Sequence, residues 1–232
     1  MKSRFDYSGT PLCESYVHIS PFSIKPSHRE QLDILREKVR WLARESFKTE
    51  FEVYSHYEEG SLKYWIAVAG SLYTSIVFYG EFRKGIDYVY HDSKVVAEWV
   101  GNSMRKVLAP TESQRYRIEN RTGALGLLKS GIDQIDSLKN DLDNCSPTEV
   151  QNRLSRIIKV LQRAVVMSHD TRDQQYIIRE TIRLLNDSFP EPPSEPDAKL
   201  LPVYAWRKRL EYLIEEREGH FSQRISRRLF LE

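Results

Sequence analysis

The chain has 232 residues and an almost even charge balance, with 35 Lys and Arg against 33 Asp and Glu, which gives a formal net charge of +2. This balance produces no global field toward nucleic acid or anionic lipid, so either kind of partner would require a local patch. The two cysteines, Cys13 and Cys145, exclude a disulfide framework and suit a reducing compartment. The first residues lack the apolar core of a signal peptide, so we expect a cytoplasmic protein.

The N-terminal part begins as an arm and then becomes helical. Residues 1–25 carry Gly, Pro and Ser without a sustained period, and they predict one short strand near Tyr16–Ser20. Ser27 and Glu30 form an S-x-x-E capping box, which predicts a helix running to about Phe47. The apolar positions at steps of three and four that define its buried face are Leu32, Leu35, Val39 and Leu42.

A β-hairpin is predicted next. Aromatic and β-branched residues dominate both 51–57 and 62–69, and the residues between these runs include a glycine that can adopt a positive φ. No other part of the sequence gives a good sheet signal. Because a lone hairpin is not stable in water, we expect other elements to cover one of its faces.

Tyr64–Gly80 is a run of seventeen residues without a formal charge. Such a run must be buried in the core, against another subunit or in a bilayer, and seventeen residues is the short limit for a spanning helix. A helix starting near Ser71 is favoured for its second half, with a third strand as the alternative. The candidate residues for self-association or membrane insertion are Trp65, Val68, Ser71 and Ile76.

The sequence after Phe82 predicts helices almost to the end. The first stops before Pro110, and a capping box at Thr111 and Gln114 predicts a short polar helix to about Arg121. A longer amphipathic pattern spans 125–142. Ser146 followed by a proline is the clearest helix start in the chain, and another helix begins near Asp170.

Catalytic and metal-binding patterns are absent from the sequence. The spacing of Gly80 and Gly85 matches a phosphate-binding loop, but the lysine and hydroxyl residue that should follow are missing. The histidines are scattered, and in the pair His169–Asp170 the aspartate is expected to cap a helix. We therefore predict no catalytic residue, no metal site and no cofactor, and we identify no resemblance to a known family.

One predicted helix carries a basic face formed by Arg153, Arg156, Lys159 and Arg163, which fall within about 120° at 100° per residue. The preceding helix carries several aspartates, so a charge-matched helical hairpin is the favoured interpretation. Binding of a phosphate backbone or of an acidic protein partner are the alternatives.

The C-terminal part predicts a docking segment. Residues 189–197 contain four prolines and form a stiff linker, after which a final helix is expected at 203–218. Large anchors of the kind favoured at binding hot spots occur in this segment, namely Tyr204, Trp206, Tyr212 and Phe221.

These patterns predict a mainly α (α+β) protein, an amphipathic helical bundle with one N-terminal β-hairpin. The expected parts are an α+β unit at 1–109, a helical region at 110–188, the linker at 189–197 and the docking helix with its basic tail at 198–232. The expected function is that of a non-catalytic interaction or oligomerisation subunit that binds a protein partner or itself. The alternatives are an oligomeric membrane-active protein that inserts residues 64–80, and a nucleic-acid-binding accessory protein.

Overall fold

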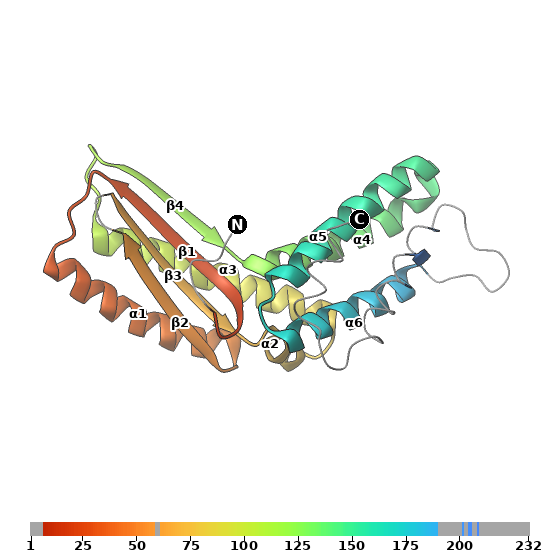
Figure 1. Ribbon diagram of the computed structural model, residues 1–232, viewed down its shortest axis with the longest axis horizontal. Coiled ribbons are helices and arrows are strands. Elements are labelled where there is room, and N and C mark those ends of the chain that lie inside the picture. Colours follow the sequence, from red (N-terminus) through yellow and green to blue (C-terminus); the bar gives the residue numbers. More distant parts are fainter. Residues whose placement is uncertain (1–6, 59–60, 190–200, 202–203, 206–207, 209–232) are drawn as a thin grey trace. The chain divides into compact units, whose positions relative to one another are not determined.

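The computed structural model describes residues 7–58, 61–189, 201, 204–205 and 208, and its architecture is mixed α+β and mainly helical (Figure 1). The chain divides into two compact units, Met1–Gly126 and Leu127–Glu232. Each unit is described below by itself.

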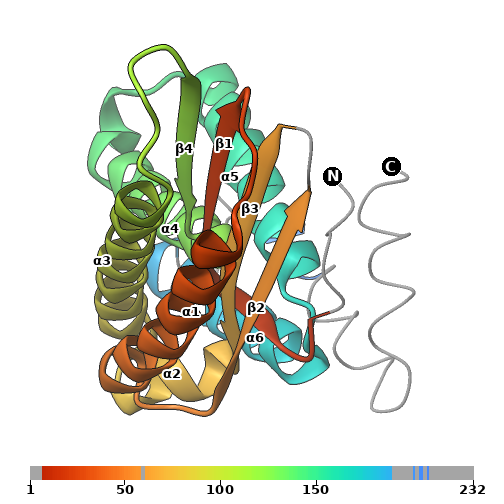
Figure 2. The same ribbon diagram turned by 90° about the vertical axis from the view of Figure 1, so that its left-hand side faces the viewer.

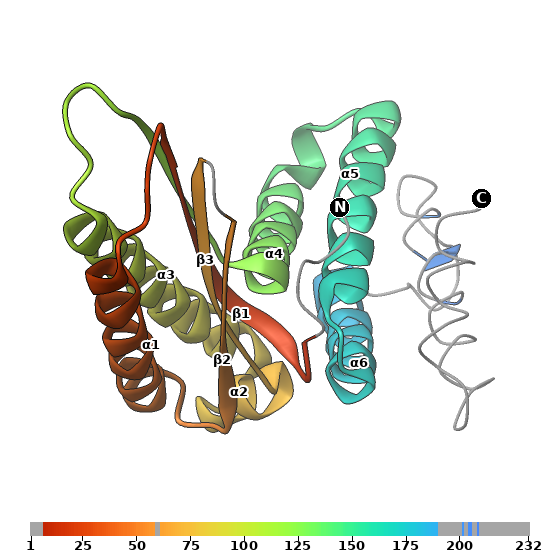
Figure 3. The same cartoon turned by 60° about the vertical axis from the view of Figure 1, so that its left-hand side comes forward.

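The first unit contains an antiparallel four-stranded sheet with strand order β2-β3-β1-β4. Figures 2 and 3 show its helices on one face of this sheet, with α1 and α3 lying side by side. The elements of the unit are β1 (Thr10–Ser20), α1 (Pro26–Phe47), β2 (Phe51–Glu58), β3 (Leu62–Gly70), α2 (Leu72–Phe78), α3 (Phe82–Leu108) and β4 (Arg115–Arg121).

The predicted hairpin is confirmed as β2 and β3, but the prediction of a single hairpin was incomplete. Residues 10–20, expected to be mostly an arm, form β1 in the interior of the sheet. The register between β1 and β3 shifts between Pro11 and Cys13. A bulge of this kind breaks the alternation of inward and outward side chains, which is why the first half of β1 gave no clear period.

The short helix predicted to end at Arg121 is wrong, because this segment forms β4. Thr111 and Gln114 do make a capping-type turn, in which the Thr111 amide donates to Gln114 Oε1 at 2.9 Å. The Gln114 side-chain amide then donates to the Pro21 carbonyl at 2.6 Å, which fixes the turn beside the end of β1. Pairing of residues 115–121 with β1 replaces the helix, so a tertiary contact overrides the local signal.

Helix starts were predicted with mixed success. The first helix begins at Pro26 after Lys25, whose amide donates to His28 Nδ1 at 3.2 Å, so Ser27 is not the N-cap. The helix favoured after Gly70 is confirmed as α2, with Ser71 Oγ accepting from the Thr74 amide at 3.2 Å. The caps predicted at Ser146 and Asp170 are also confirmed.

The core of the first unit lies between the sheet and α1, α2 and α3. Inward-facing residues of the central strands, such as Val17 and Ile66, are fully buried, as are Val39 of α1 and Val89 of α3. One polar contact also joins these layers, because the buried Ser15 hydroxyl donates to the Ala97 carbonyl of α3 at 2.7 Å. Burial of one side of each helix therefore turns its other side outward.

The second unit contains most of α4 (Gly123–Asp141), the 3₁₀ turn η1 (Leu142–Asn144), α5 (Pro147–Met167) and α6 (Thr171–Ser188). The α4 and α5 helices approach closely at Gly131, where an added Cβ would lie 2.6 Å from Leu161 Cδ2. This close approach fits the predicted helical hairpin. Most of the predicted linker and C-terminal helix lies outside the described residues.

Gly85→Ala tests the contact between α2 and α3. An added Cβ at Gly85 would lie 2.4 Å from the Ile76 carbonyl oxygen, which is backbone and has little freedom to move. We expect the substitution to lower the free energy of unfolding by roughly 1–3 kcal/mol, because overpacking outweighs the better helix propensity of alanine. Urea unfolding measures this difference, and Asn102→Ala on the exposed side of α3 is the control. A Gly85→Ala protein as stable as the wild type would contradict the close packing.

Candidate interaction surfaces

The uncharged run at 64–80 is divided between a strand and a short helix. Val68 of β3 and Ile76 of α2 are buried in the core of the first unit, and Ser71 caps α2. Trp65 lies on the opposite face of β3 and is also buried. None of the helices in the described part of the chain is long and apolar enough to cross a membrane. The burial of Val68 and Ile76 fits a role in the folded core, whereas Ser71 is only partly buried.

The predicted basic face lies on α5, and only part of it is exposed. Arg153 Nη1 lies 3.0 Å from Asp141 Oδ2 of α4, and Nη2 donates to the Ser137 hydroxyl at 2.8 Å. The Arg153 guanidinium thus links the two helices of the hairpin. The three remaining side chains, Arg156, Lys159 and Arg163, are exposed to solvent.

A pocket of about 480 Å³ lies at the start of α5, and two of the side chains that line it, Ser146 and Arg153, have partners within the fold. The Ser146 hydroxyl accepts from the Glu149 amide at 3.3 Å, and Arg153 is held by Asp141. Besides these groups, the pocket offers the N-terminus of α5 and exposed polar side chains such as Arg156. It gives no reason to assign a ligand.

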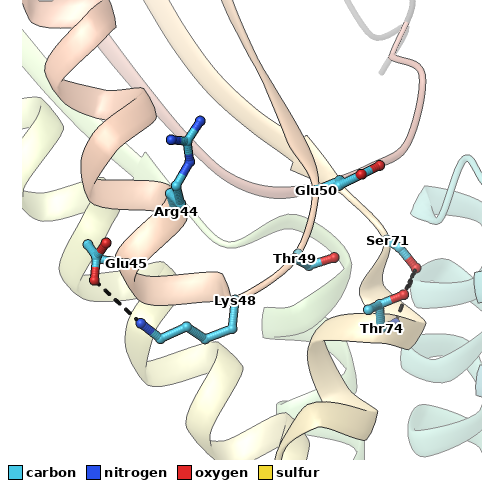
Figure 4. A pocket seen from close by; sticks show the side chains of 7 residues that line it. All are labelled: Arg44, Glu45, Lys48, Thr49, Glu50, Ser71 and Thr74. Atoms are coloured by element: carbon cyan, nitrogen blue, oxygen red, sulfur yellow. Dashed lines mark hydrogen bonds and ion pairs between the residues drawn. The ribbon is translucent and has the colours of Figure 1, made fainter.

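A larger pocket of about 730 Å³ lies in the first unit, between the end of α1 and the start of α2 (Figure 4). Lys48 Nζ lies 3.5 Å from Glu45 Oε2, and the Ser71–Thr74 contact belongs to the cap of α2. Two acidic and two basic side chains line the pocket, so it has no excess of either charge. The lining residues are Arg44, Glu45, Lys48, Thr49, Glu50, Ser71 and Thr74.

The candidate metal ligands and the two cysteines were considered next, among the residues that the structure describes. Within them, no group of three or more His, Cys, Asp or Glu side chains is arranged to hold a metal ion. Both cysteines are buried, and burial raises the pKa of the Cys13 thiol to about 12. At neutral pH this thiol is protonated and is therefore a poor nucleophile.

The predicted C-terminal docking residues are mostly beyond the described structure. Tyr204 is described and its side chain is buried. Trp206, Tyr212 and Phe221 lie outside the described residues. Docking of a partner by this segment stays a prediction.

Sequence reasoning missed a set of exposed apolar side chains on α1 and α3. We call this set the α1–α3 outer surface, and it consists of Ile34, Trp41, Tyr88, Val95 and Trp99. The exposed fraction is 66% for Trp41, 56% for Tyr88 and 38% for Trp99, which are high values for large aromatic residues. Single exposed apolar residues are ordinary, but five on two neighbouring helices form a candidate binding surface.

The signal for the outer surface was present in the sequence. At 100° per residue, Ile34 and Trp41 lie about 180–200° around the helix from Leu32, on the side opposite the buried face. Tyr88 and Val95 are likewise seven residues apart, and Trp99 follows four residues later. A large apolar residue opposite the buried stripe is the pattern that indicates a second interface on one helix.

Local contacts hold one edge of the outer surface in place. The Tyr79 ring stacks on the Tyr88 ring with centroids 5.1 Å apart, and the Tyr79 hydroxyl donates to Asp92 Oδ2 at 2.8 Å. Burial, together with this hydrogen bond, raises the pKa of Tyr79 to about 12, so the hydroxyl stays a donor at neutral pH. The exposed Phe78 ring packs edge-on against Tyr79 at 5.3 Å. The apolar surface therefore continues onto α2.

The sheet face opposite α1–α3 carries a row of aromatic rings with balanced charges around it. Tyr16 stacks on Trp65 at 4.8 Å, and Trp65 lies 5.7 Å from His56 between ring centroids. Ion pairs flank this row: Lys63–Glu58 at 3.0 Å, Arg121–Glu14 at 3.6 Å and Arg117–Glu119 at 2.5 Å. Because carboxylates lie beside these cations, the face does not offer the excess positive charge that a phosphate backbone requires.

Comparisons with models of protein families, with curated proteins and with solved structures found no match to this chain. Function is therefore inferred from the chain's own residues. Of the predicted site residues, Val68 and Ile76 are each buried in the first unit, and Arg153 is linked to Asp141 of α4.

Arg153→Met tests the charge-matched hairpin of α4 and α5. The substitution keeps the aliphatic stem and removes the contacts with Asp141 and Ser137, so we expect a loss of about 1–2 kcal/mol in the free energy of unfolding. The control is Arg156→Met on the same helix, where the exposed side chain should change stability by less than about 0.5 kcal/mol. Urea unfolding of both variants gives the comparison. Equal stabilities would show that Arg153 does not hold the hairpin.

Proposed function

We propose that this protein is a non-catalytic interaction subunit of a cytoplasmic multi-protein complex and that it binds another protein through the α1–α3 outer surface. The observation that carries the proposal is the exposure of Trp41, Tyr88 and Trp99 on neighbouring helices. Trp and Tyr are the residues most enriched at binding hot spots, because they combine a large apolar area with few rotatable bonds.

The position of the outer surface supports a rigid interface. On both helices, the side opposite the outer surface is buried in the core at residues such as Val39 and Val89. Near the start of α3, Gly85 packs closely against α2. An interface on such helices loses little conformational entropy when a partner binds. It could therefore act without the ordering of a loop.

The second unit has a supporting role in this proposal. We treat α4, α5 and α6 as a small amphipathic bundle. The close approach at Gly131 and the Arg153–Asp141 ion pair support its α4–α5 part. The Gln174 side chain of α6 donates to the Ser168 carbonyl at the end of α5 at 2.6 Å. We further propose that the segment beyond this bundle adds a second contact with the partner through its large aromatic residues. Its contribution is separable from that of α1 and α3, because the two lie in different units.

Binding of nucleic acid by the basic face of α5 is a weaker proposal. Only Arg156, Lys159 and Arg163 of the predicted basic face are exposed. Three cations on one helix give a modest, strongly salt-dependent affinity unless other groups assist. Membrane binding is also weaker, since three of the four side chains proposed for insertion, Trp65, Val68 and Ile76, are buried in the described structure.

Photo-crosslinking in the native host tests the proposed interface. We would replace Trp41 or Val95 with the photoreactive residue p-benzoylphenylalanine, and use Met167 of α5 as a matched exposed apolar control. We expect discrete adducts with protein, identified by mass spectrometry, from positions 41 and 95 in at least fivefold higher yield than from position 167. Adding Trp99→Glu to the chain labelled at Val95 should remove its adducts.

Similar yields from all three positions would contradict the proposed interface. Adducts with lipid alone at positions 41 and 95 would also contradict it, and would favour the membrane alternative. Circular dichroism and urea unfolding of each variant check that the chain stays folded.

A further inference from the structure

We infer that the protein bound at the α1–α3 outer surface is a second copy of this chain, and that α1 of one copy lies against α3 of the other. This inference rests on the proposed function, since it names the partner at the same surface. The dimer is isologous, so each copy contributes both helices and the contact between α1 and α3 occurs twice.

The exposed apolar area fits what a dimer of this size needs. If an aromatic side chain offers roughly 200 Å², the exposed fractions of Trp41, Tyr88 and Trp99 leave roughly 300 Å² of aromatic surface in water. Ile34 and Val95 add to this area. The sum, roughly 450 Å², lies in the middle of the range for the largest apolar patches on monomers, about 300–600 Å², which are often functional. It would supply more than half of the about 800 Å² that each partner buries in a standard interface.

The arrangement of the two helices leaves two ways to form such a dimer. The Tyr79 hydroxyl lies 3.4 Å from the Ser46 carbonyl oxygen, so the end of α1 lies near the start of α3 and the two helices run antiparallel (Figure 2). If the two-fold axis runs along the helices, α1 faces α3 of the other copy. If the axis runs across them, α1 faces α1 and α3 faces α3.

Charge distinguishes these two arrangements. Among exposed side chains, α1 has three basic and four acidic residues, whereas α3 has five basic and two acidic ones. Placing α3 against α3 would bring two surfaces of net charge +3 together (5 − 2), whereas placing α1 against α3 puts a surface of net charge −1 (3 − 4) against it and avoids this repulsion. The basic residues of α3 in this count are Arg83, Lys84, Lys94, Arg105 and Lys106, and the acidic residues of α1 are Glu30, Asp33, Glu37 and Glu45.

The spacing of the apolar residues also fits a helix-on-helix contact. Ile34 and Trp41 are seven residues apart on α1, and Tyr88 and Val95 are seven residues apart on α3. Matching seven-residue intervals allow side chains of two facing helices to interdigitate along a shared line, at an axis separation of about 8–10 Å. The antiparallel α1–α3 contact between copies would repeat the contact that the same helices make within one copy.

The test is the mass of the full chain, measured by size-exclusion chromatography with light scattering and by sedimentation equilibrium over a range of concentrations. We expect the wild type to approach twice the chain mass at tens of micromolar. Trp41→Glu alone and Val95→Lys alone should each weaken the dimer at least tenfold, whereas Met167→Glu in the second unit should leave it unchanged.

Mixing the variants tests the pairing itself. An equal mixture of Trp41→Glu with Val95→Lys should form a mixed dimer more tightly than either variant alone, because one α1–α3 contact is then wild type and the other pairs glutamate with lysine. A mixture of Trp41→Glu with Val95→Glu should recover less, since its second contact opposes two carboxylates. Urea unfolding confirms that each variant is folded.

Three results would overturn the inference, and they differ in whether the proposed function is still supported. A wild type that stays monomeric at 100 μM overturns self-association, and adducts with a different protein at positions 41 and 95 would then still support the proposed function. A wild-type dimer whose variants show no recovery on mixing overturns the pairing of α1 with α3. A monomer that also gives no protein adducts at these positions overturns both the inference and the proposed function.

Discussion

The packing of α3 against the sheet is the contact on which the first unit depends. One side of this long helix carries Val89, Val96 and Val100, which are buried, and the hydroxyl of Ser15 reaches from β1 to the Ala97 carbonyl in the same layer. An amphipathic helix buries one apolar stripe, about 100° wide or more, and leaves its opposite face outside the core. The side that carries Tyr88, Val95 and Trp99 is therefore turned outward by the same packing that forms the core. The α1 helix, which lies beside α3, is constrained in the same way at Trp41.

Charge has a different role in each part of the molecule. On the sheet face opposite the helices, and at Arg153 in the second unit, basic groups lie beside carboxylates and stabilise the fold locally. On the outer side of α1 and α3, the two helices differ in their balance of charge, and the apolar side chains lie between their charged residues. An apolar centre with charges around it resembles the usual arrangement of a protein interface, in which the apolar part supplies affinity and the charges select the orientation.

The sequence predicted those elements whose signals are local. The caps at Ser146 and Asp170 and the helix after Ser71 follow from side chains that bond to nearby amides, and the β2–β3 hairpin follows from residues next to each other in the chain. The strands β1 and β4 were missed or shortened because their pairing joins residues about a hundred positions apart. For β4 the local signal was misleading, since Gln114 forms a capping-type contact that leads into a strand.

The candidate surface was missed for a related reason. The apolar stripe of α1 was read from residues such as Leu35 and Val39, and Trp41 does not belong to that stripe. Its exposure depends on which side of the helix the sheet covers, and that follows only from the complete fold. Three environments were considered for the uncharged run at 64–80: the core, another subunit and a bilayer. The burial of Val68 and Ile76 agrees with the first of them, the core.

The most direct test of the proposed interface is ¹⁹F NMR of the protein labelled with 5-fluorotryptophan and measured over a range of concentrations. Trp41 and Trp99 lie on the outer surface, whereas Trp65 is buried and serves as the internal control. The chain has four tryptophans, and assignment comes from the variants Trp41→Phe, Trp65→Phe, Trp99→Phe and Trp206→Phe. Self-association through α1 and α3 predicts that the resonances of Trp41 and Trp99 shift or broaden as the concentration rises, while that of Trp65 stays constant. Resonances of Trp41 and Trp99 that stay constant and solvent-exposed at all concentrations would contradict it.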